Sequence, residues 1–164
     1  MTRAIIATEL GTIEADLYTD GAPKATANFV KLAKQGFYDD VIFHRCIPGF
    51  VIQGGDGEFG KKASLNTGRV WTGGPGYRFD DEPFTGDYYR GTLAMANAGP
   101  NSNGSQFFIC HQDLIGKLPK NYIIFGQVSK GLDIVDQIAN APRNAKDLPD
   151  KPVAMTSVTI EDEG

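Results

Sequence analysis

The sequence predicts a mainly β protein whose strands close into an antiparallel barrel capped by two α-helices. Eight short segments rich in Val, Ile and Phe are separated by turn-forming residues at hairpin-like spacing, which is typical of antiparallel sheets. Two segments have the apolar periodicity of a helix, and no strand–helix–strand rhythm indicates a parallel sheet. The 20 glycines and 9 prolines also favour strands and turns over long helices.

The first half of the chain contains four of these strands and one helix. Residues 4–8 and 13–18 flank a turn, and the second segment alternates apolar and polar residues, as expected for a hairpin with one face in water. A helix is predicted next, because Pro23 suits a first helical position, apolar residues recur at helical spacing and Gly36 suits the stop. Residues 41–52 then form two strands joined by a Pro-Gly turn.

The second half contains the other four strands and the second helix. Residues 91–96 and 105–110 are strand-like, and the segment between them is saturated with turn formers. Residues 122–128 form a further strand, and the apolar residues within 132–139 recur at helical spacing. A final strand at residues 153–160 completes the predicted barrel.

Length and composition exclude several classes of protein. At 164 residues we expect a single domain covering 1–164, large enough to bury a full core. The net charge of −4 offers no basic field for nucleic acid. No apolar run is long enough to span a bilayer and no signal-peptide core is present, so we expect a cytoplasmic protein without a membrane partner. Cys46 and Cys110 lie in apolar runs and are expected to be buried and free.

A glycine-rich stretch at residues 57–76 has neither strand nor helix periodicity. Ordered loops of this length tend to be functional, although a surface insertion costs little loop entropy. Two interpretations stay open, a tolerated insertion, which we favour, and a flank of a binding groove. Residues 55–62 fall one residue short of a phosphate-binding loop and carry acidic side chains where phosphates would lie, so no nucleotide cofactor is predicted.

The remaining polar clusters have simple explanations. Asp80, Asp81 and Glu82 precede a proline and are expected to be solvated carboxylates in a turn rather than a cation site. His44 and His111 lack zinc-like spacing with either cysteine, so each is expected to be a packed or surface histidine. No nucleophile and base pair indicates hydrolysis. We therefore predict no metal site.

One cation stands among apolar residues. Arg45 lies between Phe43 and Ile47 in a predicted strand, and Gln53 follows in the neighbouring one. An arginine cannot be neutralised, so it needs either water or a defined acceptor. Arg45 therefore lies either on a wet outer face of the barrel or in a functional site, and its surroundings alone do not decide between the two.

Two blocks of the sequence resemble a known family, and this resemblance favours a functional site for Arg45. The cyclophilin family of peptidyl-prolyl cis-trans isomerases has two signature blocks, and the chain closely resembles both, with FHRCIPGFVIQGGD at residues 43–56 and MANAGPNSNGSQFFI at residues 95–109. The likeness extends through the opening hairpin, residues 79–82 and residues 124–126, so it covers nearly the whole chain. The resemblance implies an eight-stranded antiparallel barrel with a helix over each end, and a substrate groove on its outer surface.

The resemblance also implies which residues form the site. The family's catalytic arginine corresponds to Arg45. The walls and floor of its proline pocket correspond to Phe50, Val51, Phe108 and Leu118. The remaining substrate contacts correspond to Gln53, Gln106, Ala96, Asn97, Ala98 and Tyr122.

The chain departs from the family pattern at several positions. Val51 stands where methionine is usual, and Tyr122 stands where histidine is most common. The tryptophan on the pocket rim of many members is absent, and Trp71, in the glycine-rich loop, is not expected to replace it. The segment around Leu118 also differs in length. With one aromatic anchor missing, we expect cyclosporin, the cyclic peptide that the family commonly binds, to bind only weakly.

The implied chemistry suits these residues. An X-Pro bond rotates slowly because amide resonance gives a barrier of roughly 18–20 kcal/mol, and rotation moves electron density back onto the prolyl nitrogen. A fixed cation such as Arg45 would stabilise the twisted state more than the planar one. The predicted function is isomerisation of proline-containing peptides and protein clients by a monomer that assists folding. A proline-binding or chaperone module with incidental turnover is the alternative.

Overall fold

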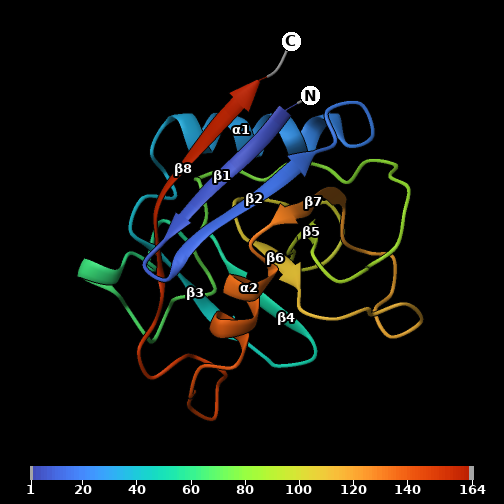
Figure 1. Cartoon of the computed structure of the whole chain (residues 1–164). Helices are drawn as coiled ribbons and strands as arrows, with labels where there is room; N and C mark the ends of the chain where they lie inside the picture. Colours follow the sequence, from blue (N-terminus) through green and yellow to red (C-terminus); the bar gives the residue numbers. More distant parts are fainter. Residues whose placement is uncertain (1, 163–164) are drawn as a thin grey trace.

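Eight strands form one closed antiparallel barrel in the computed structural model, which describes residues 2–162 (Figure 1). The strands are β1 (Thr2–Thr8), β2 (Gly11–Leu17), β3 (Val41–Cys46), β4 (Val51–Gly54), β5 (Thr92–Met95), β6 (Phe107–Cys110), β7 (Ile124–Lys130) and β8 (Ala154–Asp162). Around the barrel they follow the order β1-β2-β7-β5-β6-β4-β3-β8. The predicted fold class is confirmed. The predicted strand bounds differ from the observed ones by at most two residues, as where β6 begins at Phe107 rather than at residue 105.

One helix covers each end of the barrel (Figure 1). The first, α1 (Pro23–Lys34), begins at the predicted proline and is followed by Gly36, whose φ of 72° is accessible to glycine at little cost. The second, α2 (Leu132–Ala139), buries Val135 and Ile138 in the core. Phe29 of α1 packs against Phe107 of β6 with ring centroids 5.4 Å apart. Each helix therefore fills its end of the barrel with apolar side chains.

One strand next to the predicted site, β6, is apolar on both faces. Phe107 and Ile109 of β6 belong to the central core, whereas Phe108 and Cys110 belong to a second cluster outside the barrel, together with Val51 of β4. Successive side chains of a strand point to opposite faces, so β6 is covered from both sides. The outer cluster supplies the apolar floor on which a binding site can form. Both cysteines are buried and free, as predicted.

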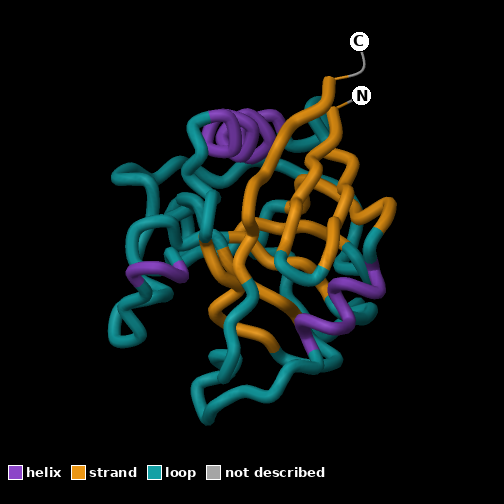
Figure 2. The backbone as a smooth tube through the Cα atoms, turned by 60° about the vertical axis from the view of Figure 1, so that its left-hand side comes forward, coloured by secondary structure: helices purple, strands orange, loops and turns teal. Residues whose placement is uncertain are grey.

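Long loops surround this outer cluster. Figure 2 shows the loop that carries the short 3-10 helix η1 (Lys62–Ser64) projecting to one side of the barrel. Beside α1, Thr2 of β1 pairs with Asp162 of β8, so the first and last described residues lie close together. Within residues 2–162, neither α-helix has the length and apolar content that a membrane crossing requires.

The acidic cluster before Pro83 corrects one expectation. Glu82 is not a solvated turn residue, since only 9% of its surface is exposed. Its two carboxylate oxygens accept hydrogen bonds from the backbone N–H groups of Lys24 and Ala25, at 2.9 and 2.8 Å. These N–H groups lie in the first turn of α1 and have no acceptor within the helix. A negative charge at this end of a helix also interacts favourably with the helix dipole. Glu82 therefore caps a helix that lies 57 residues away in the sequence.

Candidate functional site

Three predicted site residues lie in a row across the outer surface. Arg45 of β3 is opposite Gln53 of β4, and Gln53 is in turn opposite Phe108 of β6. Residues directly opposite each other in antiparallel strands share a face of the sheet. The barrel register thus brings residues from separate sequence blocks onto one surface.

Nine of the eleven predicted residues line one cavity of about 220 Å³, which we call the Arg45 pocket. Its lining consists of His44, Arg45, Phe50, Val51, Gln53, Trp71, Ala96, Asn97, Phe108, Leu118 and Tyr122. The two remaining predicted residues, Ala98 and Gln106, line a neighbouring cavity instead. Sequence reasoning left out His44 and Trp71.

Aromatic packing fixes one wall of the Arg45 pocket. The rings of Phe108 and Tyr122 meet edge to face with centroids 5.6 Å apart. Behind them the buried Tyr88 hydroxyl donates to the Tyr122 carbonyl at 2.7 Å and accepts from the Tyr122 N–H at 3.1 Å. Burial raises the pKa of Tyr88 to about 12, so its hydroxyl remains a donor at neutral pH. Tyr88 was not predicted, because it makes this contact across 34 residues of sequence.

The Arg45 guanidinium has N–H donors that no described residue uses. It is exposed at the rim of the pocket, with its central carbon 5.8 Å from the centre of the Phe50 ring. Within residues 2–162 it makes neither an ion pair nor a hydrogen bond. Gln53 is its neighbour in register, yet the Gln53 amide donates to Gln106 at 3.3 Å. Arg45 therefore holds a full positive charge beside an apolar cavity, with its N–H donors available to a ligand.

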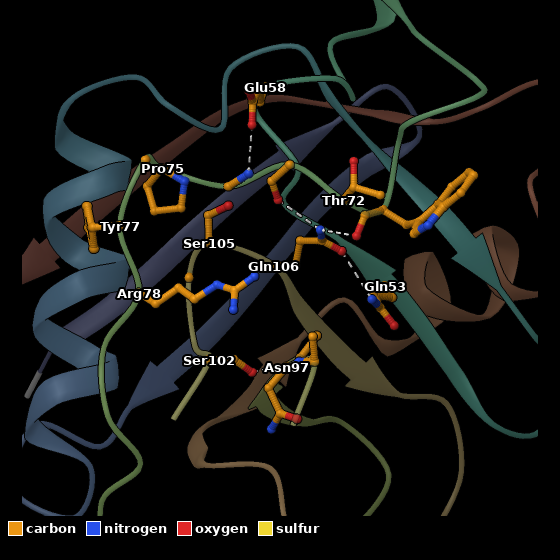
Figure 3. A pocket seen from close by; sticks show the side chains of 17 residues that line it. Gln53, Glu58, Thr72, Pro75, Tyr77, Arg78, Asn97, Ser102, Ser105 and Gln106 are labelled. Atoms are coloured by element: carbon orange, nitrogen blue, oxygen red, sulfur yellow. Dashed lines mark hydrogen bonds between the residues drawn. The ribbon is translucent and has the colours of Figure 1, made fainter. Parts of the chain in front are cut away.

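Gln106 joins the barrel to the glycine-rich loop. Its amide nitrogen donates to the carbonyls of Trp71 and Gly73, at 2.8 and 3.0 Å, while its oxygen accepts from Gln53 (Figure 3). These groups line a second cavity of about 380 Å³, the loop pocket, between residues 71–78 and residues 96–98. Gln106 thus contacts the loop directly and sets where that wall of the groove lies.

A buried carboxylate holds the same loop from below. Asp56 accepts four backbone N–H bonds of 2.9 to 3.1 Å, from Glu58, Phe59, Trp71 and Gly73. A Cβ at residue 73 would overlap the Asp56 carboxylate, so only glycine fits there. Several charge-assisted bonds to one side chain make a well-defined loop conformation. Residues 71–76 are consequently a fixed flank of the groove, which favours the second of the two interpretations left open for this loop.

Trp71 lies at the site, although from the sequence it was considered only as a replacement for the rim tryptophan and was not expected to be one. This residue is 49% exposed, and it lines the Arg45 pocket, the loop pocket and a third cavity described below. Its backbone is fixed at both ends, by Asp56 on the N–H and by Gln106 on the carbonyl. An aromatic residue within a glycine-rich loop was the available signal, but the sequence did not reveal these anchors.

His44 is packed, as expected, but it is not satisfied. It is 5% exposed, and within residues 2–162 neither ring nitrogen has a hydrogen-bond partner. Burial, together with the nearby charge of Arg45, lowers the pKa of His44 to about 4. The imidazole is therefore neutral at physiological pH, with one unused donor and one unused acceptor.

A charged network supports the turn that carries Phe50. The Nδ1 atom of His111 accepts a hydrogen bond from the Gly49 N–H at 2.8 Å, and its Nε2 atom lies 2.9 Å from Asp136. Because Nδ1 is an acceptor, Nε2 carries the hydrogen and donates a hydrogen bond to the carboxylate of Asp136. Arg90 completes the network with two bonds to Asp136, of 2.7 and 3.0 Å. His111 thereby connects α2 to the edge of the Arg45 pocket.

Replacing His111 should loosen this turn. We expect His111→Ala to raise KM for a proline peptide about fivefold with little change in kcat, because loss of one hydrogen bond is worth roughly 1 kcal/mol. The oxygen of Asn takes the place of Nδ1, so His111→Asn should retain near wild-type KM. Steady-state kinetics with thermal melts test both variants. Equal impairment of the two at equal stability would show that packing, not the Gly49 bond, is what matters.

Comparison with known proteins gives a consistent result. The sequence model of the family described as cyclophilin type peptidyl-prolyl cis-trans isomerase/CLD matches residues 3–160. A peptidyl-prolyl cis-trans isomerase of Synechococcus elongatus is 44% identical over 145 residues, covering 87% of this chain and 92% of its relative. One of Schizosaccharomyces pombe is 44% identical over 158 residues, with 93% and 95% covered.

A solved structure agrees with these sequence matches. It is a cyclophilin type peptidyl-prolyl cis-trans isomerase of Cryptosporidium parvum, crystallised in the presence of the dipeptide Ala-Pro. It superposes with a TM-score of 0.86 at 33% identity, covering 98% of this chain and 99% of that one. The barrel, the matched sequence blocks and these relatives lead to one conclusion: the chain belongs to the cyclophilin-type peptidyl-prolyl cis-trans isomerases, a family of enzymes.

Proposed function

We propose that the chain isomerises X-Pro bonds by holding the pyrrolidine ring in the Arg45 pocket and stabilising the twisted amide with the Arg45 guanidinium. The observation that carries this proposal is the uncommitted cation at the rim of an apolar, aromatic-walled cavity. A cavity of about 220 Å³ is suited to a small ring rather than to a large side chain. Neither a cofactor nor a metal enters the mechanism.

The catalytic step consists of rotation without any bond being made or broken. As the amide twists, its nitrogen becomes pyramidal and gains a lone pair, to which an N–H of Arg45 can donate. In the planar state that lone pair is delocalised and accepts poorly, so the hydrogen bond is stronger in the twisted state. The apolar surroundings of Phe50 and Phe108 lower the local dielectric and strengthen the interaction.

The groove on either side of the pocket would hold the peptide chain. Residues 96–98 form one wall and residues 71–74 the other, and both are fixed by hydrogen bonds to Gln106. Walls that do not move let one half of the substrate stay in place while the other half rotates. Gln53, between Arg45 and Gln106, is placed to contact the substrate backbone.

A proline-binding or chaperone module would use the same pocket without depending on turnover. The two functions separate in a protease-free assay that follows the cis population of an X-Pro peptide by NMR exchange. The proposed enzyme accelerates exchange at substoichiometric concentration, whereas a binding module holds the peptide and leaves the exchange rate unchanged. The client proteins would be polypeptides with accessible prolines. A monomeric state and a cytoplasmic location remain predictions.

Cyclosporin should bind more weakly here than to members of the family that carry the rim tryptophan. The rim tryptophan is absent, and Tyr122 replaces the usual histidine. Loss of one aromatic anchor at an interface costs about 2 kcal/mol, a factor of about thirty in affinity. Titration calorimetry on this chain and on a tryptophan-bearing member, in the same buffer, measures the difference. Equal affinities would mean that Trp71, from the other wall, supplies the missing contact.

A further inference from the structure

A third cavity lies next to the Arg45 pocket, and the proposed reaction does not use it. This cavity of about 690 Å³, the linker pocket, lies between the glycine-rich loop and the linker at residues 141–152. The loop contributes Thr67, Val70 and Trp71, and the linker contributes Asn144, Ala145, Lys146 and Leu148. It shares His44, Arg45 and Trp71 with the Arg45 pocket, so the two cavities are adjacent.

The lining of the linker pocket combines apolar, cationic and unsatisfied polar groups. Val70 and Leu148 provide aliphatic surface, and the exposed face of Trp71 provides an aromatic one. The Lys146 ammonium lies 5.8 Å from the centre of the Trp71 ring, and no carboxylate is among the lining residues. His44, more than nine-tenths buried, also lines the cavity, with its unpaired donor and acceptor. A buried polar group without a partner is rare in native proteins, and a ligand hydroxyl in this cavity would supply the partner.

We propose that the linker pocket binds the side chain of a tyrosine near the prolyl bond of the substrate. The phenol ring suits the surface formed by Trp71, Val70 and Leu148, and its electron-rich face suits the Lys146 cation. The hydroxyl both donates and accepts, which is what the neutral imidazole of His44 lacks. This inference rests on the proposed function, because the Arg45 pocket must hold the proline for the flanking residue to reach this cavity.

The geometry limits where the tyrosine can stand. An extended peptide advances about 3.3 Å per residue, so adjacent cavities are reached by residues one to three positions from the proline. The loop pocket is a separate cavity, lined by Trp71, Gln106 and residues 96–98. The preference should therefore appear on one side of the proline only.

A peptide series tests the proposal. Each of the three positions before and after proline is occupied in turn by Ala, Phe, Tyr, Leu or Glu, and kcat/KM is measured for isomerisation. We expect Tyr to exceed Ala about tenfold and Phe about threefold at one position, with Leu and Glu below Tyr. If no position shows a tyrosine preference, the proposal is overturned. A preference for glutamate would also overturn it and would identify Arg45 and Lys146 as the groups that recognise the substrate.

Two variants and one control substitution locate the preference in this cavity. Ala145→Trp fills the linker pocket and should reduce the Tyr-to-Ala ratio to near one, whereas Ala63→Trp, at an exposed alanine of η1 outside the cavity, should retain it. His44→Leu should reduce the Tyr-to-Phe ratio to one. Thermal melts confirm that each variant is folded. A ratio that survives Ala145→Trp contradicts the assignment.

The outcomes separate this inference from the proposed function. Turnover of the all-alanine reference peptide without any tyrosine preference refutes the linker pocket and leaves the isomerase intact. Loss of turnover with every peptide refutes the proposed function. In that case peptide affinities from calorimetry, compared in the same series, still decide whether the cavity selects tyrosine.

Discussion

Arg45→Ala is expected to lower kcat/KM for an X-Pro peptide by about 10² to 10³, the effect of removing one oriented donor worth roughly 2.7–4 kcal/mol in the transition state. The effect should fall mainly on kcat, because the lone pair that accepts the hydrogen bond is present only in the twisted state. The fold should survive. Arg45 is exposed and makes neither an ion pair nor a hydrogen bond within residues 2–162, and such surface substitutions change stability by about 0.5 kcal/mol or less.

Two controls sharpen the measurement on Arg45. Arg45→Lys should recover little activity, because lysine keeps the charge but loses the planar set of donors that extends over the Phe50 ring. Peptide binding should be followed in parallel with isomerisation and with a thermal melt. Full activity in Arg45→Ala with an unchanged melt would falsify the assignment of Arg45 as catalytic. Weakened binding with unchanged turnover of bound peptide would instead identify a docking residue.

The sequence predicted the strands and helices, which depend on local residue patterns, and those site residues that lie in the two blocks resembling the family. The strands follow from apolar runs bounded by turn formers, and α1 from a proline, a helical period and a glycine. Nine of the site residues meet in the Arg45 pocket. Seven of them come from the two blocks resembling the family, which include the adjacent strands β4 and β6, and Leu118 and Tyr122 come from the segment between β6 and β7. Their grouping is thus a consequence of the barrel register, which the resemblance supplied.

What the sequence did not predict depends on contacts between distant segments. Glu82 was expected to be solvated because it precedes a proline in a turn. The helix end that it caps lies 57 residues earlier, so the sequence shows no sign of the contact. Asp56 was considered only as an acidic residue that argues against a phosphate-binding loop, whereas its carboxylate organises the loop through four backbone N–H groups. Trp71 reaches the site only because that loop is folded back and fastened to Gln106. Propensity and periodicity describe neighbours in sequence, so none of these contacts leaves a local signal.

Acid should destabilise the protein through His44 at a pH where most carboxylates are still ionised. Its pKa falls from 6.5 in the unfolded chain to about 4 in the fold, chiefly because burial disfavours the charged imidazolium and secondly because Arg45 is nearby. Between these values the unfolded state binds the proton and the folded state does not, so unfolding is favoured as pH falls from about 6.5 towards 4. The contribution is fully present above pH 6.5. Its loss amounts to about 2 kcal/mol at pH 5 and about 3 kcal/mol at pH 4.

His44→Leu isolates this contribution because every other titrating group is retained. Urea unfolding of both proteins at pH 7.5, 6 and 5 gives the two free energies of unfolding. Between pH 7.5 and pH 5 the free energy of unfolding of the parent should fall by about 2 kcal/mol more than that of the variant. At pH 7.5 the variant should already be at least as stable as the parent, since it removes two buried nitrogens that have no partner within residues 2–162. Parallel pH dependence in the two proteins would mean that His44 is solvated or paired in solution. The imidazole would then have no unused donor or acceptor to offer a substrate, and the linker pocket would lose the group that distinguishes tyrosine from phenylalanine.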